Sequence, residues 1–205
     1  MTKHALWIAI FLGGTTALLW RTSRPSDSRA ASQKAVNVGF QTGQTAPDFE
    51  LRALDGTMLR LSGLRGAPVL LNFWATWCAP CRVEMPWLVE LDRQYRAQGV
   101  QIIGVSLDDP GAQAEVAKFT MERSVRYPVL LGNASVADAY GGVRFLPQSF
   151  FIDQEGKIKA SRVGMPDRAQ LDKGIQELLG HRLQSLVIGH QSLVVGRHQR
   201  SSRRS

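Results

Sequence analysis

The chain is poor in the two residues that most often build metal sites. It has two cysteines and four histidines in 205 residues, and the histidines stand at positions 4, 181, 190 and 198. Two cysteines are too few for a disulfide-rich scaffold or a four-thiolate zinc site. Because every histidine lies outside residues 47–180, half of a zinc site around Cys78 and Cys81 is also disfavoured. We therefore expect no metal and no cofactor, and one cysteine pair.

Acidic residues are nearly absent from both ends of the chain. The net charge is +8, of which residues 1–46 carry +4 and residues 181–205 carry +5, while residues 47–180 carry −1. A protein that binds nucleic acid carries its basic residues on the folded surface. Here the basicity belongs to the ends, so the sequence predicts no nucleic-acid partner.

One uncharged apolar run, residues 5–20, follows a short basic start at residues 1–4. Sixteen helical residues span about 24 Å, less than the roughly 30 Å hydrocarbon core of a bilayer. We interpret the run as a membrane anchor, with a cleaved signal peptide and a buried helix as alternatives. Arg21 and Arg24, which follow it, favour a cytoplasmic C-terminal side by the positive-inside rule. That orientation conflicts with the chemistry described below.

Amino-acid composition divides the rest of the chain into three parts. Residues 21–46 are polar and form a linker, residues 47–180 form the folded domain, and residues 181–205 form a basic tail. The domain alternates apolar runs with helical periodicity, which predicts an α/β fold with a central sheet and helices on both faces. Strands are expected at 49–54, 57–61, 68–74, 100–107, 129–131, 149–153 and 157–163, and helices at 78–97, 112–123 and 167–179. The first two strands form a hairpin around Asp55-Gly56, and Gly180 is expected to stop the last helix.

Two cysteines, Cys78 and Cys81, lie where a predicted buried strand ends and a predicted helix begins. At a helix N-terminus the unpaired amide groups stabilise a negative charge, so the pKa of Cys78 should fall below the free value of about 8.5. Cys81 lies one turn later on the same face, within reach of a disulfide. Cys78 would attack a partner disulfide, and Cys81 would release the mixed disulfide. A purely structural disulfide closing so small a loop would contribute only about 2 kcal/mol, so a redox-active pair is favoured.

The sequence FWATWCAPCRVEMP resembles the active-site segment of thioredoxin-fold proteins of the TlpA/ResA branch. The resemblance runs from about residue 46 to residue 180, through APDF, VSLDD and LPQSFFID. It implies a thioredoxin-like fold, with a central mixed sheet, helices on both faces and an N-terminal hairpin extension. It also implies a membrane-anchored, extracytoplasmic thiol–disulfide oxidoreductase, of a branch that includes reductases serving cytochrome c maturation.

The resemblance assigns further residues to the site. Pro147 would be a cis-proline facing the cysteine pair, and the Leu146 backbone would pair with a substrate chain, although the family more often has Thr or Val at that position. Trp77 is expected on an apolar docking surface. Glu84 follows Cys81 by three residues, on the same helical face. It is either an ordinary solvated carboxylate favoured by the helix dipole, or a partly buried acid of raised pKa that takes the proton from Cys81.

The expected function is reduction of disulfides in extracytoplasmic client proteins, with apocytochrome c as a candidate client and a membrane thiol reductase as electron donor. The expected location is the bacterial inner membrane, with the domain in the periplasm. A peroxiredoxin-type thiol peroxidase is an alternative, but its Pro-x-x-x-Thr/Ser-x-x-Cys cradle is absent, since Leu71 and Ala75 stand at those positions ahead of Cys78. A non-enzymatic, membrane-tethered binding module is the third interpretation.

Overall fold

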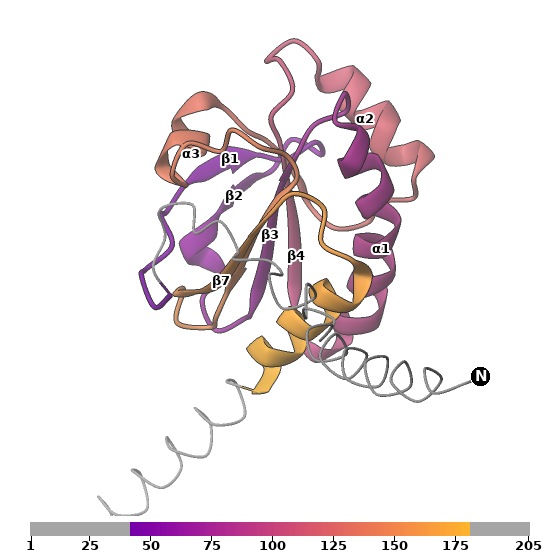
Figure 1. Ribbon diagram of the computed structural model, residues 1–205. Helices are drawn as coiled ribbons and strands as arrows, with labels where there is room; N and C mark the ends of the chain where they lie inside the picture. The colour runs from indigo at the N-terminus through magenta and orange to yellow at the C-terminus, as the bar shows by residue number, and fades with distance from the viewer. Residues whose placement is uncertain (1–41, 181–205) are drawn as a thin grey trace, which may run out of the picture. The chain divides into compact units, whose positions relative to one another are not determined.

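The computed structural model describes residues 42–180, and the segments predicted as anchor and basic tail lie outside these residues. Within them, no helix is both long and apolar enough to cross a membrane. The domain begins with a two-stranded hairpin and continues with strands that alternate with helices (Figure 1). The elements are β1 (Glu50–Arg52), β2 (Met58–Arg60), η1 (Leu61–Leu64), β3 (Val69–Trp74), α1 (Ala79–Tyr95), η2 (Arg96–Gln98), β4 (Gln101–Ser106), α2 (Gln113–Glu122), β5 (Val129–Leu131), α3 (Ala134–Ala139), β6 (Gln148–Ile152), β7 (Ile158–Val163) and a helix at residues 168–180.

The main sheet has five strands in the order β5-β4-β3-β6-β7. Strand β3 pairs in parallel with β4, which pairs in parallel with β5, whereas β6 runs antiparallel to β3 and β7 antiparallel to β6. Every residue of β3 is buried, because the strand has a neighbour on each edge and a packed layer on each face. The chain leaves this central strand directly into the segment that carries the cysteines.

The two faces of the sheet are covered by different layers, as Figure 1 shows. On one face α1, α2 and the helix at residues 168–180 pack over Leu70 and Trp74 of β3. On the other face the β1–β2 hairpin, η1 and α3 pack over Leu71 and Phe73. Because side chains alternate between the two faces along β3, the strand contributes residues to two separate hydrophobic cores. The predicted mixed sheet, with helices on both faces and an N-terminal hairpin, is confirmed.

The predicted elements agree with the structure except in two places. Helix α3 was not predicted, because ASVADA is too short to show a helical period; it begins where the Asn133 side chain accepts a hydrogen bond from the amide of Val136 (2.9 Å). The expected stop at Gly180 was wrong, since Gly180 is still helical. At the other end of that helix the Asp167 side chain accepts a hydrogen bond from the amide of Gln170 (2.8 Å).

Gly174 allows the helix at residues 168–180 to lie close against the sheet. A Cβ atom at this position would overlap the Phe151 ring of β6. We expect Gly174→Ala to lower the free energy of unfolding by about 1–2 kcal/mol, because overpacking outweighs the roughly 1 kcal/mol by which alanine favours a helix. Urea denaturation measures the change. Gly180→Ala is the matched control, since a Cβ there meets nothing within 4 Å, and equal stability of the two variants would contradict the prediction.

Candidate active site at the amino end of helix α1

Cys78 occupies the N-cap position of α1, four residues after the end of β3. Its sulfur accepts a hydrogen bond from the backbone amide of Cys81 (3.2 Å), and the two residues form a disulfide with a Cα–Cα distance of 5.3 Å. The structure therefore shows the oxidised state of the pair predicted from the sequence. Both residues are buried, with exposed fractions of 4% and 2%.

The position of Cys78 determines its chemistry once the disulfide is reduced. The first turn of a helix has amide groups without helical partners and a partial positive charge. The amide of Cys81 already points at the Cys78 sulfur, and Pro80, in the same turn, has no amide to satisfy. A thiolate at Cys78 would therefore be stabilised by an arrangement that is in place before reduction.

Glu84 lies in α1, three residues after Cys81, and is buried, with an exposed fraction of only 1%. Burial raises its pKa from 4.5 to about 8. The Asn72 amide of β3 donates to its Oε1 (3.2 Å) and also to the Ser149 hydroxyl of β6 (2.9 Å). The other carboxyl oxygen, Oε2, is buried without a partner among the described residues. Glu84 is therefore not the solvated carboxylate of the first interpretation, and its role as proton acceptor for Cys81 stays a prediction.

The bond between Leu146 and Pro147 is cis, as the resemblance implied. The carbonyl of Pro147 accepts a hydrogen bond from the amide of Gly164 (2.8 Å), just beyond the end of β7. Leu146 packs against the same core cluster that contains Cys78 and Cys81. The structure thus brings the loop before β6 to the cysteine pair, from a distant part of the chain.

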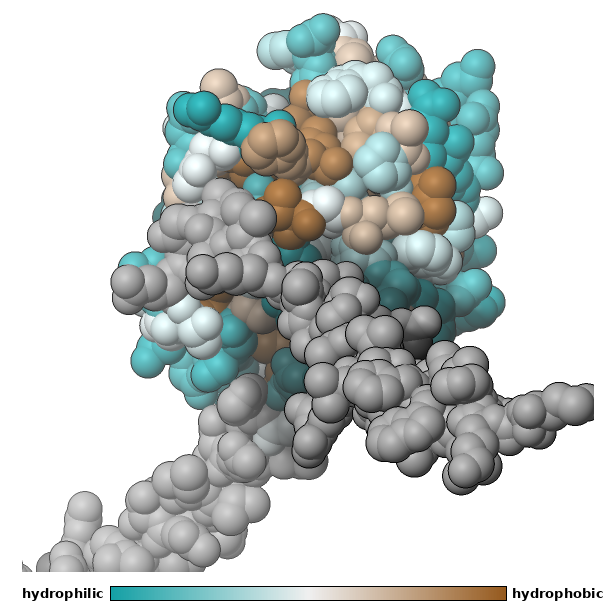
Figure 2. All heavy atoms as spheres, in the orientation of Figure 1, coloured by the Kyte–Doolittle hydropathy of each residue, from teal (hydrophilic) through white to brown (hydrophobic). Residues whose placement is uncertain are grey.

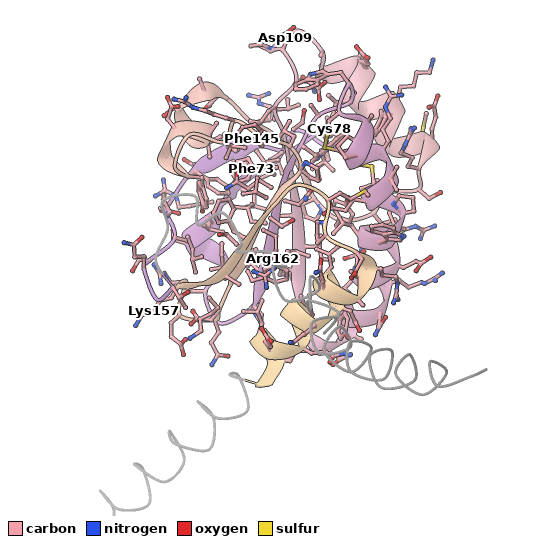
Figure 3. All side chains as sticks on the ribbon, in the orientation of Figure 1. Phe73, Cys78, Asp109, Phe145, Lys157 and Arg162 are labelled. Atoms are coloured by element: carbon pink, nitrogen blue, oxygen red, sulfur yellow. A yellow bond between two sulfur atoms is a disulfide. The ribbon has the colours of Figure 1, made fainter. Side chains whose placement is uncertain are left out.

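Exposed apolar side chains lie next to these groups in the sequence. Trp77, which precedes Cys78, is 66% exposed, and Phe145, which precedes Leu146, is 69% exposed. Hydrophobic residues gather on the face seen in Figure 2, and Figure 3 labels Phe145 and Cys78 on that face. Exposed aromatic groups of this kind are typical of protein-binding surfaces, so the expectation for Trp77 agrees with its position. By contrast, Trp74 is fully buried and stacks on Phe119 (5.4 Å between ring centroids).

No group of three or more His, Cys, Asp and Glu side chains in residues 42–180 could hold a metal ion.

Comparison with known proteins matches residues 42–161 to the AhpC/TSA family. The thiol-disulfide oxidoreductase ResA of Bacillus cereus is 35% identical over 139 residues, which cover 68% of this chain and 79% of the relative. ResA of Geobacillus thermodenitrificans is 39% identical over 137 residues, covering 66% and 77%.

The chain belongs to the AhpC/TSA family and is a thiol–disulfide oxidoreductase of the ResA type. Among solved structures it is similar to a thioredoxin-family thiol:disulfide interchange protein from Chlorobium tepidum TLS, with a TM-score of 0.62 and 27% identity. That match covers 68% of this chain and 99% of the other.

Sequence reasoning missed the polar partners of this ResA-type site. Asn72 stands within the apolar run PVLLNFW, where a single amide in a buried strand was a signal that could have been followed. Ser149 and Asp108 were inside quoted segments, LPQSFFID and VSLDD, but nothing in one sequence shows what they contact. Asp108 accepts hydrogen bonds from the amide and hydroxyl of Thr76, two residues before Cys78.

The buried carboxyl group makes stability depend on pH. Because the pKa of Glu84 is about 8 in the folded protein and near 4.5 when unfolded, its contribution is complete below pH 4.5 and is lost as pH rises through 8. The loss amounts to on the order of 5 kcal/mol. We expect Glu84→Gln, which keeps the acceptor for Asn72, to flatten the pH dependence of unfolding between about pH 5 and 8. Urea denaturation at a series of pH values measures it, and parallel curves for the two proteins would contradict the assignment.

Proposed function

We propose that the Cys78–Cys81 pair is the redox centre of this oxidoreductase and that it acts as a reductant of disulfides in client proteins outside the cytoplasm. The observation that carries the proposal is the position of Cys78, at the N-cap of α1 with the amide of Cys81 directed at its sulfur. The pairing of the two cysteines in the structure and the names of the ResA relatives support it.

The reaction is two successive thiol–disulfide exchanges. The Cys78 thiolate attacks one sulfur of the client disulfide, and the other client sulfur leaves as a thiolate and takes up a proton. Cys81 then loses its proton and attacks the Cys78 sulfur, which breaks the mixed disulfide and releases the second client thiolate. The client gains two electrons and two protons, and the protein is left as the Cys78–Cys81 disulfide seen in the structure.

Glu84 supplies the proton transfer at Cys81. With a pKa of about 8, the carboxyl group is mostly protonated at neutral pH in the disulfide state. When a donor thiolate attacks Cys78, Cys81 leaves as a thiolate and Glu84 can protonate it. The resulting carboxylate can take that proton back when Cys81 attacks in the next cycle.

The client would bind across the loop that carries Trp77 and the loop that carries Leu146 and Pro147. Leu146 packs against the core cluster that contains both cysteines, where an extended client chain could hydrogen-bond to its backbone. The exposed Trp77 ring offers an apolar contact next to the attacking sulfur. These contacts depend mainly on the client backbone and on apolar groups, so several clients could share the site.

The proposed setting is the outer face of a bacterial inner membrane, with residues 5–20 as the anchor. An oxidising compartment returns a dithiol to its disulfide, so the protein would need a membrane thiol reductase as electron donor. Apocytochrome c is a candidate client, because the resemblance is to a branch that includes reductases serving cytochrome c maturation. The anchor and its flanking arginines lie outside the described residues.

Membership of the AhpC/TSA family adds little support to the alternative function of a thiol peroxidase. The two positions that would carry the proline and hydroxyl residue of a peroxide cradle are Leu71 and Ala75, which are apolar and fully buried. Neither side chain can donate a hydrogen bond to a peroxide oxygen. No described feature favours the non-enzymatic binding module over a redox-active dithiol.

Cys81→Ser tests the assignment of the two cysteines. Without the resolving thiol, Cys78 should remain joined to its client, because no second attack can break the mixed disulfide. We expect non-reducing gels of cells that express the variant to show adducts that disappear with dithiothreitol.

Cys78→Ser is the matched control for the trapping experiment, and it should yield no adducts, since Cys81 lacks the N-cap position that would stabilise its thiolate. Equal trapping by both variants would refute the assignment of Cys78 as the attacking group. A measured reduction potential near about −120 mV would instead place the protein with the oxidants.

A further inference from the structure

Thr76, two residues before Cys78, has all of its polar groups hydrogen-bonded. Its amide donates to both carboxyl oxygens of Asp108 (3.1 and 3.0 Å), and its hydroxyl donates to Oδ1 of the same residue (2.6 Å). Its carbonyl accepts from Nε of Arg82 (2.8 Å). Thr76 is buried. The loop between β3 and α1 is therefore held by Asp108, which binds the amide of Thr76, and by Arg82, which binds its carbonyl.

Asp108 is itself fixed to the sheet. The hydroxyl of Ser106, the last residue of β4, donates to its Oδ2 (2.8 Å), and the backbone amide of Asp108 donates to that same hydroxyl (3.2 Å). Ser106 is buried, and the amide of Leu107 donates to the carbonyl of Trp74 (2.8 Å). The carboxylate is thus held at the carboxyl end of β4, next to the end of β3.

Arg82 connects this loop to helix α1. It lies in the first turns of α1, one residue after Cys81, and its guanidinium group lies 5.7 Å from the centre of the Phe119 ring. Phe119 stacks on Trp74, the last residue of β3. The end of β3, the loop and the start of α1 are therefore connected through side chains that none of the redox steps uses.

We propose that Asp108 is a positioning residue, which holds the loop through Thr76 so that the Cys78 sulfur stays aligned with the first turn of α1 during exchange. The inference rests on the proposed role of Cys78 as attacking group. Cys78 is joined to this loop by the hydrogen bond from its amide to the carbonyl of Ala75 (3.2 Å). A displaced loop would move the sulfur away from the Cys81 amide, and small misplacements of a reacting group reduce rates strongly.

The positioning of the loop by Asp108 and the negative charge of Asp108 act on the exchange rate in opposite directions. Variants can therefore separate them. A carboxylate near a thiolate disfavours the thiolate by repulsion, so removal of the charge alone should leave exchange as fast or make it faster. Asp108→Asn keeps an oxygen that can accept both Thr76 hydrogen bonds made to Oδ1, and its amide can donate to Ser106. Asp108→Ala removes the charge and the hydrogen bonds together.

The experiment measures the reaction of Cys78 with 5,5′-dithiobis(2-nitrobenzoic acid) at neutral pH, in the full chain carrying Cys81→Ser so that one thiol remains. We expect Asp108→Ala to slow the reaction by about tenfold, the change that loss of a hydrogen bond to a charged group produces. We expect Asp108→Asn to react at the parent rate or faster. Asp109→Ala is the matched charge control, because Asp109 lies on the same loop (Figure 3), and it should keep the parent rate.

Two outcomes would overturn the proposal. One is an Asp108→Ala rate equal to that of the parent, and the other is an Asp108→Asn rate that falls as far as the alanine rate. Should Asp108→Ala fail to fold, as judged by circular dichroism, Thr76→Val replaces it, since this variant loses the 2.6 Å hydrogen bond and keeps the amide. It should react several-fold more slowly than Asp108→Asn, and equal rates would count against the proposal. A parent whose Cys78 reacts like a free thiol would refute the proposed function separately.

Discussion

The amino end of α1 is the constraint on which the rest of the site depends. A sulfur at the N-cap meets amide groups that no helical carbonyl can satisfy, and in this protein the amide of Cys81 is directed at Cys78. The central strand β3, buried over its whole length, delivers the chain to that point. In the proposed function a client reaches this sulfur across the loops that carry Trp77, which is exposed, and Pro147, which follows a cis bond. The parts of the fold near the site therefore all bear on one atom, the Cys78 sulfur.

The protein also keeps a polar group where packing alone would exclude one. Glu84 is buried, with its Oε1 hydrogen-bonded to the Asn72 amide and its Oε2 without a partner among the described residues. A buried carboxyl group with a raised pKa destabilises the folded state when it ionises. Such conflicts between stability and local chemistry are concentrated at functional sites. In the proposed reaction this group gives a proton to Cys81 and accepts it back.

The sequence predicted most of the fold because its apolar runs and turn residues are local signals. The cysteine spacing and the strand before it were sufficient to locate the cysteine pair, and the cis bond at Pro147 was predicted through the resemblance. Asn72 was hidden within an apolar strand, and α3 was too short to show a period. The contact between Thr76 and Asp108 joins residues 32 positions apart, so it depends on the pairing of β3 with β4 and cannot be inferred from either segment alone. Glu84 was left with two interpretations because burial is a property of the packed structure.

The most direct test of this account is the pH dependence of Cys78 alkylation by iodoacetamide in the reduced full chain carrying Cys81→Ser. If the amide groups at the start of α1 stabilise the thiolate, the midpoint will lie clearly below the value of about 8.5 that is typical of a free cysteine. A midpoint at or above that value would show that the helix end does not activate Cys78, and it would contradict the central claim.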